Sequence, residues 1–421
     1  MQSIDWLHVE TVTLPGGGVS EEELERIRAS IETRLPAFLG DLERLVNTDC
    51  GSYTKVGVDE VGRWTGAFLE RLGGHVEYRG DDRLGATVVG SFDGSSGGSN
   101  GLRLLLIGHL DTVFEPGTAA ARPFSIEDGI ARGPGVTDMK SGLLAGLYAI
   151  EALRELGEGS LPFDRLAFIA NPDEEIGSPS STPHITELAR DADACLVLEC
   201  ARANGDIVSS RKGILDLRLT VNGRAAHAGV EPEKGRNAIV EAARLVRELN
   251  ALNGRWQGVT VNVGVIEGGT RPNVVPESCR LDVDLRSPTR LDLESAEAAV
   301  RELCATTLVP DTNVDVEQMG RHWPMEKLEQ SGRLVEHAQA IAGRFGFAVE
   351  DAATGGASDA NTTAGMGVPT IDGLGPVGGN DHSPAEFLEV DSIVPRTALL
   401  AGLMLAIARD PVVPGWRQAA E

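Results

Sequence analysis

The chain has 421 residues and a formal net charge of −25, and 41% of its residues are hydrophobic. A chain of this length is too long to fold around one ordinary hydrophobic core, so two domains of a soluble globular protein are expected. The negative charge argues against nucleic acid as a ligand, because phosphate binding requires a basic surface. The five cysteines form no CxxC pair, which favours free thiols in a reducing compartment. With neither a signal-peptide pattern nor an apolar run approaching the ~20 residues of a membrane span, a cytoplasmic location is expected.

The first half of the chain alternates helical and strand-like patterns. Apolar residues at helical spacing predict helices over 21–47, 57–72, 139–156 and 181–190. Short apolar runs predict buried strands over 75–80, 86–92, 102–108, 165–170 and 194–200. Because strands and helices alternate and the central strands are apolar throughout, the pattern predicts an α/β fold. Its sheet would be mostly parallel and sandwiched by helices.

The pattern changes after residue 213. Strands are expected over 214–223, 259–268, 279–286 and 313–318, with helices over 236–250 and 291–305. This β-α-β-β-α-β order is that of a ferredoxin-like α+β domain. The buried stripe of its first helix is expected to consist of Ile239, Ala243, Val246 and Leu249. The α/β pattern then returns, which predicts a larger domain over 1–213 and 326–421 with a lid domain, 214–325, inserted into it.

Charged and imidazole side chains stand where the central strands end. They are His109, Asp111, Glu174, Glu175, Glu199 and His382, and Asp138 joins them at a glycine-rich turn that opens a helix. Ligands of open α/β sheets bind at the carboxyl ends of the strands, so these side chains are expected to converge. Taken singly, His109 is more often a packed residue and Asp138 a helix N-cap. Taken together, the carboxylates would repel one another strongly, and a pair of divalent metal ions would remove that repulsion.

Imidazole and carboxylate ligands suit zinc, with cobalt or manganese as alternatives. Two such ions ~3.5–4 Å apart polarise a carbonyl and activate water for hydrolysis. Asp111 lies two residues after His109 and faces the same way on an extended strand, so it is expected to accept the other imidazole N–H. Adjacent residues of an extended chain point in different directions, so Glu174 and Glu175 are expected to have different roles.

Seven short motifs carry a resemblance to a known family. They are HLDTV, GPGVTDMKSG, NPDEEIGS, LVLE, GRAAHAG, PNVVP and DHSPAE, and the resemblance extends over about residues 40–408. Their order resembles that of the glutamate carboxypeptidase, acetylornithine deacetylase and succinyl-diaminopimelate desuccinylase family. The resemblance implies a zinc-peptidase-like catalytic domain, an inserted lid and dimerisation domain, and a cis peptide bond between Asp138 and Met139. Pro179 and Pro183 depart from the family's pattern and leave open where the next helix begins.

The resemblance also implies roles for individual residues. His109 and Glu199 would hold one zinc ion, Glu175 and His382 the other, and Asp138 would bridge them. Glu174 would be the general base that takes a proton from water and gives it to the leaving amine. His227, in the lid, would reach the active site of the partner subunit, which implies a homodimer through the lid domain.

The substrate-binding positions follow from the same resemblance. Arg286 and Asn273 resemble residues that hold the substrate's free carboxylate and the oxyanion of the reaction. Gly355 and Gly356 resemble a loop whose backbone lies against that carboxylate. A guanidinium suits a carboxylate because it can bind it through two parallel hydrogen bonds. A plain salt bridge between Arg286 and an acid of the lid is the alternative.

The predicted activity is metal-dependent hydrolysis of an amide bond next to a free carboxylate. It would release a glutamate-like C-terminal amino acid from N-acyl or peptidyl conjugates, and residues 354–375 look closest to the glutamate carboxypeptidase branch. One alternative is an N-acyl-amino-acid deacylase or desuccinylase, and another is a non-catalytic relative that binds such conjugates. Glu174 argues against the latter, because a binding protein needs no base. Neither a nucleic acid nor a membrane is expected as a partner.

Overall fold

The computed structural model describes residues 14–80, 82–94 and 101–416, and the chain forms two compact units. Unit 1 comprises Met1–Ser209, Leu328–Ala352 and Gly367–Glu421, and unit 2 comprises Ser210–Lys327 and Ala353–Met366. The segment 353–366 therefore belongs with the inserted unit, although the sequence pattern placed it in the larger domain. The chain passes between the units four times, after Ser209, Lys327, Ala352 and Met366. The first and third of these points lie in two short strands, β8 (Ile207–Arg211) and β15 (Asp351–Thr354).

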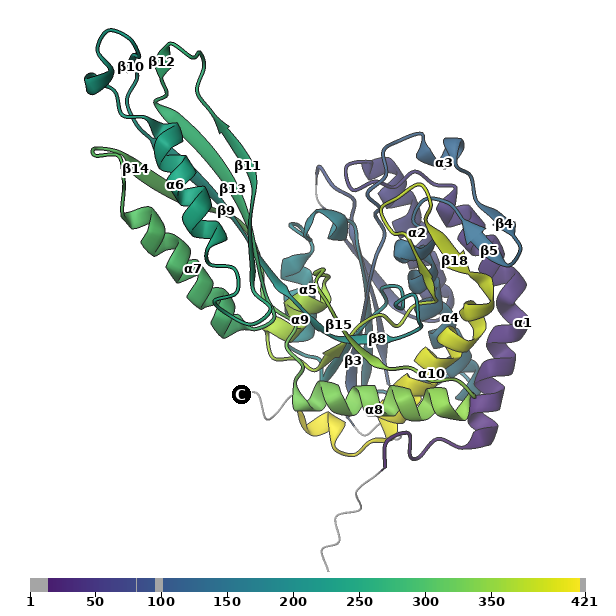
Figure 1. The fold of residues 1–421 in the computed structure, drawn as a ribbon. Coiled ribbons are helices and arrows are strands. Elements are labelled where there is room, and N and C mark those ends of the chain that lie inside the picture. Colours follow the sequence, from purple (N-terminus) through teal and green to yellow (C-terminus); the bar gives the residue numbers. More distant parts are fainter. Residues whose placement is uncertain (1–13, 81, 95–100, 417–421) are drawn as a thin grey trace, which may run out of the picture. The chain divides into compact units, whose positions relative to one another are not determined.

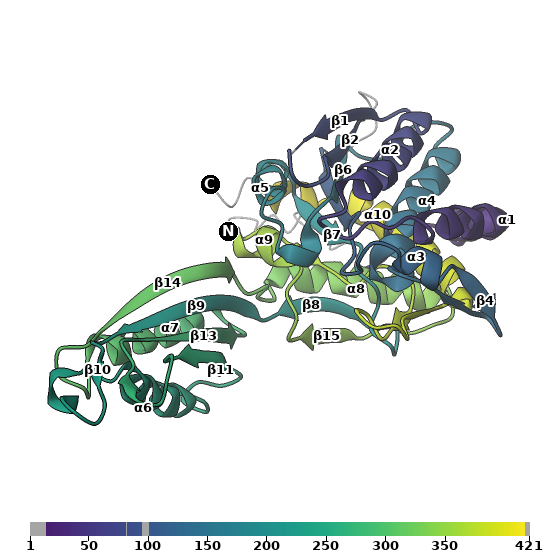
Figure 2. The ribbon, with the colours of Figure 1, turned by 90° about the horizontal axis from the view of Figure 1, so that it is seen from above.

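Unit 1 is built on a six-stranded sheet with the order β1-β2-β6-β3-β7-β16. Figure 1 labels β3 of this sheet, and Figure 2 labels β1, β2, β6 and β7. Its strands are β1 (His75–Arg79), β2 (Thr87–Asp93), β3 (Arg103–His109), β6 (Arg165–Asn171), β7 (Ala194–Val197) and β16 (Thr370–Ile371). The strands β6, β3, β7 and β16 pair in parallel, and β2 is antiparallel to both of its neighbours. The prediction of a mostly parallel sheet is confirmed. The carboxyl ends of β3, β6 and β7 consequently meet at one edge.

Helices cover both faces of this sheet, with α5 on the opposite side from α2 and α4 (Figures 1 and 2). The helices of unit 1 are α1 (Glu21–Val46), α2 (Lys55–Arg71), α3 (Thr118–Ala121), α4 (Ser141–Leu156), α5 (Thr182–Ala189), α8 (Glu329–Arg344) and α10 (Ile393–Arg409). Helix α5 begins at Thr182 with Pro183 in its first turn, where a missing N–H leaves no hydrogen bond unmade. The family departure at this point therefore does not prevent the helix.

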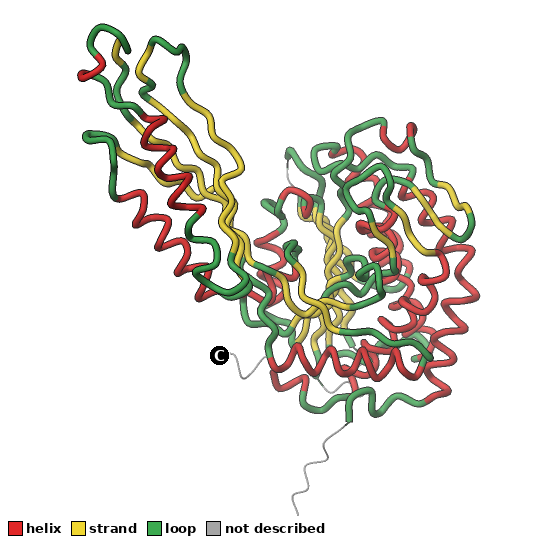
Figure 3. The backbone as a smooth tube through the Cα atoms, in the orientation of Figure 1, coloured by secondary structure: helices red, strands yellow, loops and turns green. Residues whose placement is uncertain are grey.

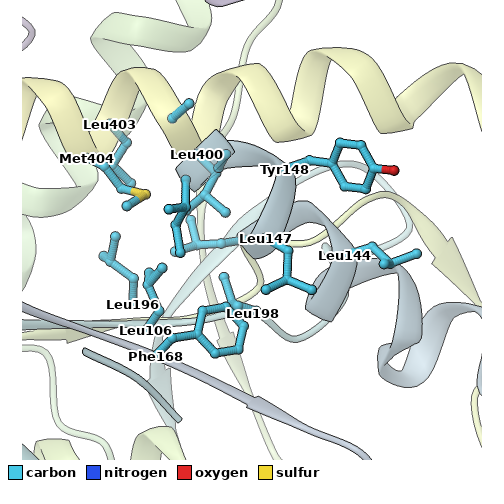
Figure 4. Packing of buried hydrophobic residues seen from close by; sticks show 14 of the residues in the cluster. Leu106, Leu144, Leu147, Tyr148, Phe168, Leu196, Leu198, Leu400, Leu403 and Met404 are labelled. Carbon is cyan, nitrogen blue, oxygen red and sulfur yellow. The ribbon is translucent and has the colours of Figure 1, made fainter. Parts of the chain in front are cut away.

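The core of unit 1 lies between the sheet and the helices α4 and α10 (Figure 4). Leu147 and Leu400 face Leu106, Phe168 and Leu196 of the sheet, and all five are fully buried. The stretch Val390–Arg409, which contains α10, is long and apolar enough to cross a membrane by length and composition alone. However, 78% of its apolar 18-residue window is buried inside the protein, and a core helix passes the same test of length and composition.

A second, four-stranded sheet of unit 1 has the order β17-β18-β5-β4. Its strands are β4 (Ser125–Glu127), β5 (Ile130–Arg132), β17 (Gly378–Gly379) and β18 (Phe387–Glu389). His382 lies in the loop between β17 and β18, and Asp138 follows β5 within the irregular helical turn η1 (Val136–Lys140). Short 3-10 turns complete the unit: η2 (Glu174–Ile176), η4 (Val390–Ser392) and η5 (Val413–Gly415).

Unit 2 is a two-layer α+β domain with a ferredoxin-like strand order, β11-β13-β9-β14, and all of its pairs are antiparallel (Figure 3). The strands are β9 (Gly213–Asn222), β11 (Thr260–Gly268), β13 (Ser278–Ser287) and β14 (Asn313–His322). The helices α6 (Ala238–Asn250) and α7 (Arg290–Ala305) pack on this sheet. Smaller elements are β10 (Ala226–His227), β12 (Val274–Val275), η3 (Pro232–Lys234) and α9 (Ala360–Gly365). The predicted β-α-β-β-α-β domain is confirmed.

The predicted stripe of α6 is confirmed for Leu249 and, in part, for Val246, which packs against the core, but it is wrong for Ile239 and Ala243. Its buried residues are Ala238, Glu241, Ala242, Leu245 and Leu249, whereas Ile239 is 39% exposed and Ala243 is exposed. One buried position is occupied by Glu241, whose carboxylate accepts hydrogen bonds from the amides of Leu308 and Val309 and from Nε of Arg244, all at 2.7 Å. A carboxylate satisfied in this way can be buried, which a count of apolar residues does not anticipate.

Candidate active site

The carboxylate of Asp138 lies between two imidazoles. Its Oδ1 is 3.2 Å from Nε2 of His109, and its Oδ2 is 3.0 Å from Nε2 of His382. His109 ends strand β3 and is buried, whereas the side chain of His382 is 55% exposed. The peptide bond between Asp138 and Met139 is cis, as the family resemblance implied. Three residues from distant parts of unit 1 thus meet at the sheet edge that the strand ends predicted.

Two glutamates extend this arrangement, one on each side. Oε1 of Glu199 is 3.6 Å from Nε2 of His109, and Oε2 of Glu175 is 3.1 Å from Nε2 of His382. The potential ligand atoms of His109, Asp138 and Glu175 lie within 4.8 Å of one another, as do those of His109, Glu174 and Glu199. The structure therefore brings together all five predicted metal ligands and the predicted base.

Asp111 is buried behind this group and organises it. Its carboxylate accepts hydrogen bonds from Ser52 Oγ at 2.6 Å and from the amides of Glu174 and Glu175 at 3.1 and 3.2 Å. Nδ1 of His109 lies 3.4 Å from this carboxylate and 3.0 Å from the backbone carbonyl of Asp111. Asp111 thus fixes the ring of His109 and the backbone of both glutamates. Sequence reasoning missed Ser52, because a serine in a loop carries no signal of its partner.

The two adjacent glutamates do not lie on extended chain, as the sequence reasoning assumed. Strand β6 ends at Asn171, and Glu174 and Glu175 open the 3-10 turn η2. Successive side chains of a 3-10 helix are rotated by about a third of a turn, since it has ~3 residues per turn. The different directions of the two carboxylates therefore come from a turn that Asp111 holds through its two amide contacts.

Charge in the site is unbalanced toward the carboxylates, since Asp138, Glu174, Glu175 and Glu199 surround two imidazoles. Burial lowers the pKa of His109, but the nearby carboxylates, Glu199 foremost, outweigh burial and raise that pKa well above its usual value. Hydrogen bonds to Asp138 and Glu175 raise the pKa of His382 to about 11. Burial raises the pKa of Glu175. This surplus of negative charge, together with imidazole nitrogen and carboxylate oxygen donors, fits divalent cations.

The remaining predicted residues belong to unit 2 and form two small groups. His227, in β10, is exposed, and the backbone carbonyl of Asn273 accepts a hydrogen bond from the amide of the neighbouring Ala228 at 3.0 Å. In the second group, Arg286 bonds Asp284 at 3.0 Å through both Nε and Nη2.

The Arg286 group also contains the predicted glycine loop. Nη1 of Arg286 donates to the carbonyl of Gly355 at 3.0 Å, and the carbonyl of Gly356 accepts from Arg211 at 3.1 Å. The structure thus brings Arg286 together with the two glycines. The pair with Asp284 matches the alternative, in which Arg286 forms a salt bridge with an acid of the lid.

Comparison with known proteins identifies the family. Residues 105–406 match peptidase family M20/M25/M40. The chain belongs to this family. It is 32% identical over 375 residues to carboxypeptidase G2 from Pseudomonas sp. (strain RS-16), across 88% of this chain and 89% of that protein. It is 30% identical over 310 residues to succinyl-diaminopimelate desuccinylase from Dechloromonas aromatica (strain RCB), across 69% of this chain and 80% of that protein.

Solved structures agree with this assignment. Aminopeptidase PepT from Bacillus cereus has a TM-score of 0.74 at 25% identity, and the match covers 89% of this chain and 99% of that one. An M20 family metallo-carboxypeptidase from Sulfolobus solfataricus shares the fold, with a TM-score of 0.67 at 16% identity over 90% of this chain and 99% of that one. The resemblance stated from the motifs is confirmed. This member of peptidase family M20/M25/M40 is a metal-dependent hydrolase of amide bonds.

Proposed function

We propose that this enzyme cleaves an amide bond next to a free carboxylate and releases a C-terminal amino acid such as glutamate from N-acyl or peptidyl conjugates. The observation that carries the proposal is the Asp138 carboxylate, whose oxygens lie 3.2 and 3.0 Å from the imidazoles of His109 and His382. Similarity to carboxypeptidase G2 supports the carboxypeptidase character. The segment 354–375 supports glutamate as the product.

Two divalent ions fit the donor set, and we propose zinc, with cobalt or manganese as substitutes. His109 and Glu199 would hold one ion, Glu175 and His382 the other, and Asp138 would contact both. When bound, the ions supply a Lewis acid for the scissile carbonyl and lower the pKa of water. The fit rests on the surplus of carboxylates around two imidazoles described above.

Side chains of the protein move the protons. Glu174 is the proposed general base, which takes a proton from the attacking water and passes it to the leaving amine. Its carboxylate lies within 4.8 Å of the donor atoms of His109 and Glu199, next to the reacting groups. Asp111 holds the amide of Glu174 and the ring of His109, so it fixes the base relative to a metal ligand.

We also propose a homodimer through unit 2, in which His227 reaches the partner's active site and polarises the scissile carbonyl. The edge strand β11 supports this assembly, because Val265 and Ile266 on it are 40% and 55% exposed. Helix α6, which packs against β11, adds Ile239 and Val240, exposed by 39% and 45%. An apolar surface beside an unpaired strand edge suits pairing with a second copy of the chain.

The substrate's free carboxylate is assigned to Arg286, Asn273 and the backbone of Gly355 and Gly356. The planar guanidinium of Arg286 is held in place by Asp284, which leaves it pre-oriented for a second partner. The negative charge of Asp284 also offsets part of the positive charge that Arg286 would present to the substrate's carboxylate. The substitution Arg286→Lys distinguishes a substrate-binding role from a structural one. If Arg286 binds the substrate's carboxylate, the substitution should raise KM. If Arg286 only pairs with Asp284, the substitution should lower the stability of the protein and leave KM unchanged.

A second candidate function is an N-acyl-amino-acid deacylase, in which the acyl group rather than the carboxylate side sets specificity. The 30% identity to a succinyl-diaminopimelate desuccinylase favours it. Release of amino acids from a panel of N-acyl and peptidyl conjugates, run with zinc, cobalt and manganese, decides between the two. The carboxypeptidase proposal expects hydrolysis whenever the terminal residue is glutamate, whatever the acyl part. If the rate of hydrolysis depends on the acyl group and not on the terminal residue, the deacylase function is supported.

We propose that the enzyme acts on small molecules in the cytoplasm. The five cysteines are free and buried, which suits a reducing compartment. The net charge of −25 disfavours binding to phosphate polymers and anionic lipid surfaces.

A further inference from the structure

The loop that carries Asp138 is bound by one buried carboxylate. The side chain of Glu386 accepts hydrogen bonds from the amides of Gly135, Thr137 and Asp138 at 2.9, 2.9 and 3.1 Å. Glu386 is only 1% exposed. Within the described part of the chain it forms no ion pair, so these three amides are what compensates its charge. Because burying a carboxylate is unfavourable unless it is hydrogen-bonded, the three amides are essential to its placement.

Glu386 also belongs to the segment that carries His382. It lies four residues after His382 and directly precedes strand β18, which pairs with both β17 and β5. A second bond ties the same segments together, because Thr137 Oγ1 donates to the carbonyl of Phe387 at 2.9 Å. Glu386 therefore links the backbone of Asp138 to the loop that holds His382.

The His382 loop needs such support. Asn380 and His382 have φ values of 58° and 60°, in the left-handed region that residues other than glycine rarely adopt. Conformations of this kind persist only where the surrounding structure holds them. The 3.0 Å separation between His382 Nε2 and Asp138 Oδ2 depends on both loops keeping their positions.

We propose that Glu386 is a positioning residue for the metal centre, which fixes Asp138 relative to His382 and thereby sets the metal affinity of the site. This inference rests on the ligand assignment proposed above. In well-formed metal sites the metal–ligand distances fall within about 0.2 Å of their usual values, so the ligands must be held in place. Residues that orient ligands typically contribute about 10–100-fold to metal affinity.

The test is a Co²⁺ titration of the full-length, metal-stripped protein followed by visible absorption, with wild type, Glu386→Gln, His382→Ala and Glu241→Gln compared. Glutamine keeps one acceptor oxygen and turns an amide donor toward the backbone N–H groups, so the loop shifts. We expect Glu386→Gln to weaken Co²⁺ binding about 10–100-fold and to alter the cobalt spectrum. Glu241 is the control, because it is also a buried glutamate that accepts two backbone amides, but it lies in unit 2 and is also paired with Arg244. Its variant should bind Co²⁺ like wild type.

The outcomes separate this inference from the ligand assignment. If Glu386→Gln is folded and binds Co²⁺ like wild type while His382→Ala is weakened, the positioning role is wrong and the ligand assignment stands. If His382→Ala also binds like wild type, both fail. Should Glu386→Gln not fold, Thr137→Val removes the second bond between the two segments and is expected to weaken Co²⁺ binding several-fold. Unchanged affinity in that folded variant likewise overturns the proposal.

Discussion

The adjacent residues Glu174 and Glu175 should fail in different ways when each is changed to glutamine. Glu175 lies 3.1 Å from His382 and is the proposed metal ligand, whereas Glu174 groups with His109 and Glu199 as the proposed base. Asp111 binds both backbone amides, and glutamine changes neither of these contacts. The two variants therefore differ in the lost carboxylate alone, and each serves as the control for the other.

The expected magnitudes follow from the two roles. Loss of a general base typically lowers the rate 10²–10⁴-fold, and with about 1.36 kcal/mol per factor of ten this is about 3–5 kcal/mol of transition-state stabilisation. Glu174→Gln should therefore lose this much in kcat with little change in KM or bound metal. Glu175→Gln removes a charged ligand from a site with a surplus of carboxylates, so its bound metal should fall first and its activity should return in part at high metal concentration.

Metal content by mass spectrometry, together with kcat and KM for a glutamate-terminated conjugate, distinguishes the two variants. Glu174→Gln with wild-type kcat would refute its role as the base. Loss of metal from Glu174→Gln to the same degree as from Glu175→Gln would show that both glutamates are ligands. Either result would contradict the division of roles that the turn η2 imposes on the pair.

Other regions give further expectations. His227→Ala should abolish turnover and leave the bound metal unchanged. If the active sites are shared between subunits, mixing this variant with the inactive Glu174→Gln variant should restore part of the activity, because one site of each mixed dimer is then complete. No recovery in mixed dimers would count against shared sites. Leu147→Ala should lower the free energy of unfolding by about 2–5 kcal/mol in a urea titration, because Leu147 is fully buried, while Leu291→Ala, at a residue 73% exposed, should stay within about 0.5 kcal/mol. A hydrogen bond from Arg409 lowers the pKa of Glu23 to about 2, so the ion pair stabilises the fold above the usual glutamate pKa and is lost as pH falls toward 2. Glu23→Gln should accordingly be about 0.2–1 kcal/mol less stable than wild type at pH 7, with a difference that shrinks between pH 5 and pH 2.

Most of the candidate site could be predicted from sequence because its residues occupy strand ends. Parallel strands place their carboxyl ends on one edge, so His109 after β3, Glu175 after β6 and Glu199 after β7 were expected to meet. His382 and Asp138 are brought there by a different sheet, β17-β18-β5-β4, whose very short strands the sequence analysis did not predict. For these two residues the sequence signal was a glycine-rich turn before Asp138, a late strand-like segment before His382, and the family resemblance.

Hydrogen bonds from backbone amides to buried carboxylates could not be predicted from the sequence. Glu386 stands in the motif DHSPAE, yet its three amide donors lie about 250 positions earlier in the chain. Glu241 similarly accepts hydrogen bonds from amides that follow α7 and is also paired with Arg244, so it occupies a buried position of α6 that was not expected to be buried. In both cases an acidic residue in the sequence indicates exposure, and only the folded backbone supplies the donors that make burial possible.

Asp111 explains why two glutamates stand next to each other in this site. A single carboxylate that accepts both amides holds two consecutive residues at once, which fixes the backbone from which their side chains project. Separating the base from the ligand by even one residue would leave one amide outside the reach of Asp111. Inserting a glycine between Glu174 and Glu175 should therefore impair the rate more than metal binding, because the ligand still has His382 to fix it at 3.1 Å and the base depends on the turn. Equal loss of metal and rate on this insertion would show that Asp111 does not organise the pair.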